Sequence, residues 1–183
     1  METIEDIDTE YENSLTKVSV LRDLSEFTVA GKTVGPFKSG QVMEVAHWVA
    51  EKLIEVGVAK FEDEQTLSLA SLSKTHWKET IPASRQIAPL QGDFYSALRR
   101  FLLRLKIASR SDPNKLKEFE KAQGLAKDIA NCRMRKIMAL AAAPPQTDQV
   151  MQNLAYDERV LYNQLSRILS DWREKILGQG FQL

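Results

Sequence analysis

The stretch GDFYSALRRFLLRLKIAS, residues 92–109, decides the fold of the C-terminal half of this chain. Its apolar residues recur every three or four positions, which is the spacing of an amphipathic helix. The residues with this spacing are Phe94, Leu98, Phe101, Leu102 and Leu105. The carboxylate of Asp93 can cap the first turn. The stretch therefore predicts a long helix that begins at Asp93 and buries one face.

Three consecutive apolar residues, Phe101, Leu102 and Leu103, point to different sides of this helix. Two interpretations remain open: a central helix inside its own bundle, or a helix that also buries a face in another subunit. Three long helices leave much apolar surface uncovered, so subunit contacts are favoured. The residues predicted for a subunit interface are Phe94, Tyr95, Phe101, Leu102, Leu103, Tyr162, Leu165, Leu169 and Trp172.

Two further long helices follow, and their ends are marked by proline or glycine. Asp112-Pro113 opens the second helix, because proline suits the first helical turn. Pro144-Pro145 closes that helix at about residue 143, and a short helix can follow the polar loop. Gly178 ends the last helix.

Charged residues of these helices are predicted to form structural ion pairs. Arg133 and Lys136 lie on the second long helix, and Asp157 and Glu158 lie at the acidic start of the last one. The alternative is a nucleic-acid-binding module that uses the basic helix faces. The chain has no interleaved ladder of aromatic residues for base stacking, so contact with DNA is expected to be weak or indirect.

The N-terminal part predicts a small β-rich unit with one helix. KVSVLRDL has the alternation of a strand, residues 44–57 have the spacing of a helix, and residues 58–61 suit a short edge strand. A turn is predicted at GPFKSG, with Gly35, Pro36, Phe37 and Gly40. A unit of about 45 residues buries little surface by itself, and we therefore expect it to need a partner surface.

The tripeptide Gly31-Lys32-Thr33 resembles the end of a phosphate-binding loop. Such a loop needs a glycine five positions earlier, where this chain has Glu26, and a helix directly afterwards. Gly35 and Pro36 make that helix unfavourable. The tripeptide therefore predicts a turn between two extended segments, with a positive φ at Gly31.

The fold class predicted is α+β, with a small β-rich N-terminal domain followed by an all-α helical-bundle domain. The residues between the two domains are rich in Ser, Thr, Glu and Gln. Trp77 lies among them, and we expect its side chain to pack against a core as an anchor. The predicted divisions are an acidic flexible tail at 1–16, the small domain at 17–61, a linker at 62–89, the helical domain at 90–178 and a C-terminal tail at 179–183.

Composition narrows the function. The chain has 25 basic and 25 acidic residues, so no overall field draws it to nucleic acid. The chain has one cysteine, its N-terminus does not resemble a signal peptide, and no apolar run is long enough to span a membrane. These features predict a soluble intracellular protein that makes no membrane contact. His76 with Glu79 is a weak metal or acid–base candidate. We predict no catalytic, cofactor-binding or metal residues. A helical enzyme subunit remains as a third interpretation, after a subunit that assembles with others and a nucleic-acid-binding module.

Several motifs together resemble the subunits of the GINS complex. In the small domain they are V-x-V-L-x-D-L at residues 18–24, G-P-F-x-x-G at 35–40 and the amphipathic helix that ends in a glycine. In the second half they are GDFY at 92–95, R-x-x-K-I at 133–137, and E-x-x-L-Y at 158–162 followed by WREKIL at 172–177. The order and spacing of these motifs carry the resemblance, which covers about residues 17–177.

The resemblance implies a non-enzymatic scaffold in DNA replication, without a cofactor. The small domain precedes the helical one, which is the order of one archaeal subunit class and of two eukaryotic Psf-type subunits, and the short chain resembles the archaeal form. The implied partners are a GINS subunit of opposite domain order in a tetramer, the MCM helicase, a Cdc45 or RecJ-like protein, primase and DNA polymerase. The implied location is the cytoplasm, associated with the nucleoid.

Overall fold

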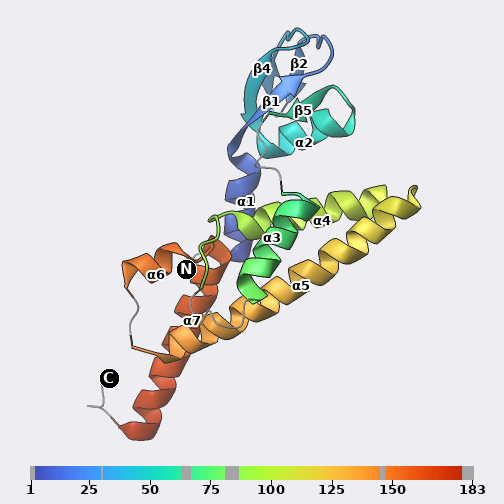
Figure 1. The fold of residues 1–183 in the computed structure, drawn as a ribbon. Coiled ribbons are helices and arrows are strands. Elements are labelled where there is room, and N and C mark those ends of the chain that lie inside the picture. Colours follow the sequence, from blue (N-terminus) through green and yellow to red (C-terminus); the bar gives the residue numbers. More distant parts are fainter. Residues whose placement is uncertain (1–2, 30, 63–66, 81–86, 145–146, 179–183) are drawn as a thin grey trace. The chain divides into compact units, whose positions relative to one another are not determined.

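An antiparallel sheet of three strands lies at the centre of the N-terminal part (Figure 1). The computed structural model describes residues 3–29, 31–62, 67–80, 87–144 and 147–178. The strand order is β4 (Val42–Ala46), β1 (Leu15–Val20), β5 (Ala59–Phe61). Val18 and Val20 of β1 are buried, because alternate residues of a strand face the same side. The predicted strand and edge strand are confirmed.

Helix α2 (His47–Glu55) covers the buried face of this sheet. The prediction that the helix begins near residue 44 is wrong, because residues 42–46 pair with β1 along their whole length. Met43 and Val45 are buried while Glu44 is exposed, which is the period-two pattern of a strand. The backbone pairing outweighs the helical spacing of the apolar residues, and the helix starts only where the pairing ends.

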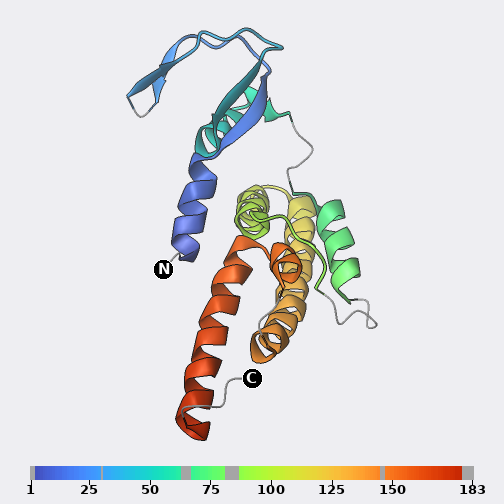
Figure 2. The ribbon, with the colours of Figure 1, turned by 90° about the vertical axis from the view of Figure 1, so that its left-hand side faces the viewer.

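A two-stranded hairpin, β2 (Phe27–Val29) and β3 (Lys32–Val34), extends from the three-stranded sheet (Figure 2). Gly31 has φ of 75° in its turn, so the predicted turn at Gly31-Lys32-Thr33 is confirmed. At the GPFKSG turn, Gly35 and Gly40 have φ of 106° and 86°, which favours glycine at both positions. The N–H of Phe37 donates to the carbonyl of Leu24, and the reverse bond also forms.

The acidic N-terminus forms helix α1 (Ile4–Asn13), so the prediction of a flexible tail is corrected for these residues. Thr3 and Asp6 cap the helix reciprocally: the backbone N–H of each donates to the side-chain oxygen of the other. These bonds to Thr3 hold the pKa of the Asp6 carboxyl below its usual value. Ile7 is buried, which gives the helix an apolar anchor that the run of acidic residues concealed.

The described residues of the C-terminal part form five helices. They are α3 (Leu69–Thr80), α4 (Phe94–Ala108), α5 (Pro113–Ala142), α6 (Asp148–Gln152) and α7 (Tyr156–Leu177). Asp112 caps α5 by accepting a hydrogen bond from the N–H of Asn114, and Gly178 follows α7 with φ of 80°, as predicted. Asp93 occupies the N-cap position of α4, but its carboxylate makes no capping hydrogen bond, which corrects that expectation.

Helix α3 lies inside residues 62–89, which the sequence analysis assigned to a linker. Leu72 of α3 is buried in the main core of the helical part, together with Phe94 and Phe101 of α4 and Ile129 of α5. Trp77 is 67% exposed, so the prediction that it is pinned onto a core is wrong. The apolar residue that anchors this segment is Leu72.

Contacts divide the chain into a small unit, Asp8–Thr66, and a helical unit, Leu67–Leu183, which also includes the first residues through Ile7. The α+β class, with a strand-containing unit followed by a helical bundle, is confirmed. Among the described residues, no helix combines the length and the apolar character needed to cross a membrane.

Candidate functional site

A fully buried arginine lies at the centre of the helical unit. Arg133 of α5 donates from Nε and Nη2 to the two carboxylate oxygens of Glu158 in α7, the second bond at 2.7 Å. Its Nη1 bonds Glu79 of α3 and the carbonyl of Ala88, and Nη2 also reaches the carbonyl of Asn153 at 3.1 Å. The planar guanidinium is suited to such bidentate pairing.

Further groups complete this ion network, which we define as Arg133, Lys136, Glu79, Glu158 and Tyr95. Lys136 donates to Glu79 at 2.7 Å, and the Tyr95 hydroxyl donates to Glu158 at 2.8 Å. Two cations therefore balance two buried carboxylates. The network joins α3, α4, α5 and α7, so it fixes the relative positions of four helices inside one unit.

The surroundings of the network determine its protonation. Burial, and then the Glu158 carboxylate, raise the pKa of the Tyr95 hydroxyl well above its usual range, so the hydroxyl stays a donor. Burial disfavours a charged guanidinium, but hydrogen bonds and charges from Glu158 and Glu79 outweigh burial and raise the pKa of Arg133. The Tyr95 hydroxyl and the Arg133 guanidinium therefore stay protonated and act as donors within the network.

The predicted ion-pair residues take partly different partners from those expected. Arg133 contacts Glu158, but Lys136 pairs with Glu79, and Asp157 pairs with Arg99 at 2.9 Å. Sequence reasoning missed Glu79 as an ion-pair partner, because its segment was assigned to a linker. The signal that was available is the seven-residue spacing of Leu72 and Glu79, which places both on one face of a helix.

The network weakens the nucleic-acid alternative. Arg133 is completely buried and Lys136 is mostly buried, and both are paired with carboxylates, so neither is available to a phosphate while the network is intact. Arg99 lies on the other predicted basic face and is paired with Asp157. Within the described residues, no group of three or more His, Cys, Asp or Glu side chains is placed to hold a metal ion.

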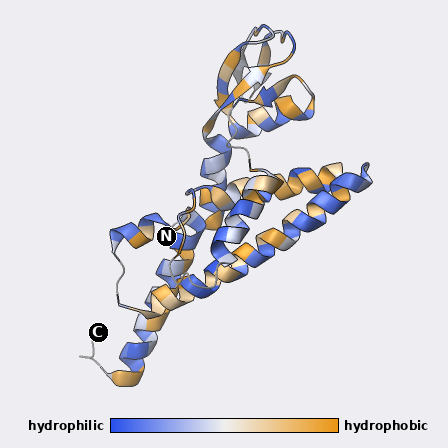
Figure 3. Cartoon of the chain, viewed as in Figure 1, coloured by the Kyte–Doolittle hydropathy of each residue, from blue (hydrophilic) through white to orange (hydrophobic). Residues whose placement is uncertain are grey.

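The second half of α7 presents a row of large apolar side chains to solvent. Ile168, Trp172 and Ile176 are 62%, 59% and 63% exposed and follow one another at four-residue spacing. We call these three residues the α7 stripe. Figure 3 shows apolar residues continuing to the C-terminal end of α7. The buried residues of α7 all lie in its first two turns, so the rest of the helix has an apolar face without cover from the described chain.

The structure separates the residues predicted for a subunit interface into three groups. Phe94 and Phe101 lie in the core of their own unit, so they are removed from the interface. The reason is that α4 packs along α5, whose Ala122, Ala126 and Ile129 lie in the same core. Half-buried positions, which pack against the two cores or beside them, are Tyr95, Leu102, Tyr162, Leu165 and Leu169. Leu103 and Trp172 are exposed.

Gly92, the first residue of the GDFY motif, is held against the start of α7. The N–H of Tyr156 donates to the carbonyl of Gly92 at 2.8 Å, and the Tyr156 ring lies where a Cβ on residue 92 would be. A side chain at this position would have to displace the ring. Gly124 in α5 is different, because a Cβ there would meet no atom within 4 Å.

We expect Gly92→Ala to lower the free energy of unfolding by about 1–3 kcal/mol, because the new methyl overlaps the Tyr156 ring. Gly124→Ala is the matched control and should raise the free energy of unfolding by about 0.5–1 kcal/mol, since alanine is the better helix former. Chemical denaturation followed by circular dichroism measures both. Equal changes in the two variants would contradict the proposed overlap, and Tyr156→Ala should recover part of the loss in Gly92→Ala.

A protein-family model matches most of this architecture. The model of the GINS complex protein helical bundle domain, Sld5, matches residues 59–177. The matched residues include α3 to α7, the whole ion network and the α7 stripe. No curated protein matches the chain.

Proposed function

This chain belongs to the GINS complex protein family, which makes it a subunit of a DNA-replication complex, and we propose that it acts there as a scaffold. GINS subunits are non-catalytic scaffold proteins. The proposal is that this chain assembles with other GINS subunits through the α7 stripe. The ion network then has a structural role, which is to hold α7 so that its second half projects in a fixed direction.

The observation that carries the proposal is the α7 stripe. Ile168, Trp172 and Ile176 form one continuous edge of a helix, and tryptophan is enriched among the residues that dominate binding energy at protein interfaces. Specific interfaces bury about 1,200–2,000 Å² in total. Three side chains supply only the centre of such an area, so we propose that exposed Leu103 and half-buried Leu165 and Leu169 belong to the same interface or to a second one.

The order of the two units supports a finer assignment. A strand-containing unit comes first and the matched helical domain comes second. We propose that the chain is of the permuted class with the small domain first, of archaeal type, and that it forms a heterotetramer with a GINS subunit of opposite order. We also propose that the small domain spans residues 17–61 and that the helical domain spans residues 90–178 together with α3.

The same proposal assigns the small domain a role in recruiting other replication proteins. Its apolar residues Leu15, Leu21, Val42 and Val56 are exposed, which gives it surface for a partner. We propose that the complex links the MCM helicase with a Cdc45 or RecJ-like protein, primase and polymerase, that DNA contact is weak or indirect, and that the protein works in the cytoplasm at the nucleoid.

Co-expression with a GINS subunit of opposite domain order tests the assembly. We expect the two chains to co-elute and to sediment as an assembly of four, because burial of the α7 stripe gains about 25 cal/mol per Å² of apolar surface. Analytical ultracentrifugation at micromolar concentration measures this. A folded full-length chain that stays monomeric alone and with the second subunit would overturn the proposal.

A further inference from the structure

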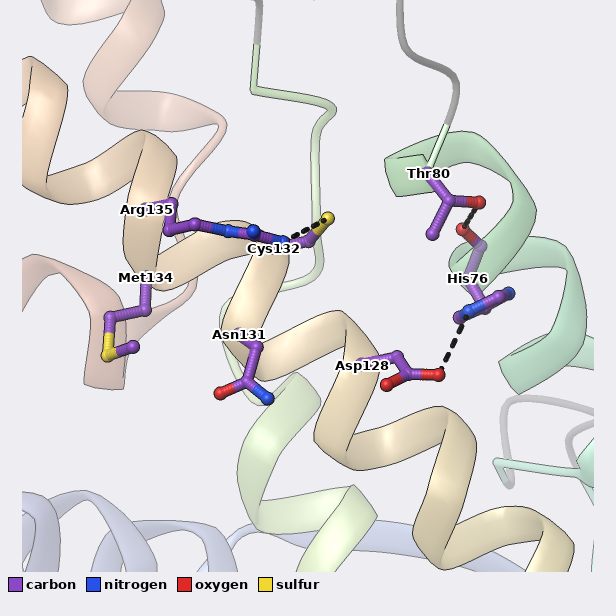
Figure 4. Close-up of a pocket in the computed structure, with 7 residues that line it drawn as sticks. All are labelled: His76, Thr80, Asp128, Asn131, Cys132, Met134 and Arg135. Carbon is purple, nitrogen blue, oxygen red and sulfur yellow. Dashed lines mark hydrogen bonds and ion pairs between the residues drawn. The ribbon is translucent and has the colours of Figure 1, made fainter.

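A pocket of about 410 Å³ lies between α3 and α5, and the residues that line it belong neither to the ion network nor to the α7 stripe. His76 and Thr80 line it from α3, and Asp128, Asn131, Cys132 and Arg135 line it from α5 (Figure 4). All of these residues belong to the helical unit. The lining is rich in hydrogen-bonding groups, so the pocket suits a polar or charged group better than an aliphatic side chain.

Arg135 is the strongest binding group of the pocket. Its Nη2 lies 3.6 Å from Cys132 Sγ, and sulfur is a weak acceptor. Throughout the described ranges, no carboxylate lies within ion-pairing distance of this guanidinium. Asp128 is turned to His76, 3.5 Å away, on the other side of the pocket (Figure 4). A guanidinium binds carboxylates bidentately, so Arg135 has an unused capacity for one.

The surface around the pocket adds positive charge and one large apolar group. Lys121 lies seven residues before Asp128 and Arg135 seven after, so the three share one side of α5. On α3, Trp77 is 67% exposed and lies beside the pocket residue His76 in sequence, and the Thr80 hydroxyl approaches the Trp77 carbonyl at 3.3 Å. Exposed tryptophan and arginine are typical anchors of protein interfaces.

We propose that this α3–α5 pocket docks an acidic peptide segment of a partner protein. One carboxylate of the segment enters the pocket and pairs with Arg135, and a neighbouring apolar side chain covers Trp77. Lys121, on the same side of α5 as Arg135, attracts further carboxylates, which speeds association more than it adds affinity. The site is separate from the α7 stripe, so the proposal does not depend on how the subunits assemble.

Two features favour a peptide over a single-stranded nucleic acid. Asp128 is 64% exposed at the pocket and would repel a continuous phosphodiester chain, whereas a peptide can place its carboxylates to avoid it. Binding of single strands also uses several aromatic residues as stacking platforms. This face offers Trp77 alone among the described large exposed aromatic residues of α3 and α5.

Peptide display on the full-length chain tests the site. A library of random peptides about a dozen residues long is selected on the wild-type chain, after removal of the peptides that bind Arg135→Glu. We expect the recovered peptides to be enriched in Asp and Glu next to an aromatic or large aliphatic residue. The most frequent peptide is then synthesised with a fluorescent label and titrated by anisotropy.

In the titration, Arg135→Glu and Trp77→Ala should each weaken binding at least tenfold, which is about 1.4 kcal/mol. Arg110→Glu, the same charge change at another exposed position of the helical unit, should leave binding within twofold. All three variants should elute like the wild type. Peptides without acidic enrichment, equal weakening by Arg110→Glu, or tighter Arg135-dependent binding of a thymidine oligonucleotide would each overturn the proposal.

Discussion

We expect Arg133→Met to lower the free energy of unfolding of the chain by about 3–5 kcal/mol, because it leaves the buried Glu158 without a cation and Glu79 with Lys136 alone. A typical domain has only about 5–15 kcal/mol in total, so this loss is large enough to unfold part of the population at physiological temperature. Methionine keeps much of the volume of the side chain. The effect therefore arises from the charges and not from a cavity.

Urea denaturation followed by circular dichroism measures the loss, and Arg135→Met is the matched control. Arg135 lies two positions further on the same helix and is exposed, so its replacement should change stability by no more than about 0.5 kcal/mol. If the two variants lost equal stability, the buried network would not be the cause. Adding Glu158→Gln to Arg133→Met should restore part of the stability, since the uncompensated charge is then removed while Lys136 still pairs with Glu79.

Replacing Ile168 and Trp172 together by glutamate should dissociate the GINS assembly without unfolding the chain. Both side chains are mostly exposed in the single chain, so the folded unit loses little. In the proposed interface the two carboxylates would be buried without partners, which costs several kcal/mol in addition to the lost apolar contacts. Truncation of one such anchor commonly costs at least about 2 kcal/mol, so we expect the dissociation constant to rise by about a hundredfold or more.

Sedimentation of the co-expressed subunits at several concentrations measures this change, with a circular dichroism spectrum to verify the fold. Ser170→Glu places the same charge on an exposed polar position of α7, and it should assemble like the wild type. Intact assembly of the double variant would show that the α7 stripe is not the interface. Leu102→Asp would be a poor test, because Leu102 packs against the core of its own unit and its replacement would destabilise the fold.

The amino-acid sequence by itself determined the features that depend on a few neighbouring residues. The turn at Gly31, the start of α5 at Asp112-Pro113 and the end of α7 before Gly178 could all be predicted. In each case the backbone geometry is imposed by the residue itself: glycine accepts a positive φ, and proline suits the first helical turn. The family could also be recognised from the motifs of the second half, which lie within the matched residues 59–177.

Only the tertiary structure decided which apolar and charged residues meet. Glu79 and Arg133 are 54 positions apart, and no local pattern shows that they share a buried network. Phe94 and Phe101 of α4 lie in a core that they share with residues of α3 and α5, not at an exposed interface, and Trp77 lies at the surface. In the same way β4 replaced the first turn of a predicted helix, because its hydrogen bonds run to a strand far away in sequence. The burial of a residue depends on which segment covers it, and that segment is often distant in the sequence. The periodicity of apolar residues could therefore identify the apolar faces of α4, α5 and α7, but not the elements that pack against them.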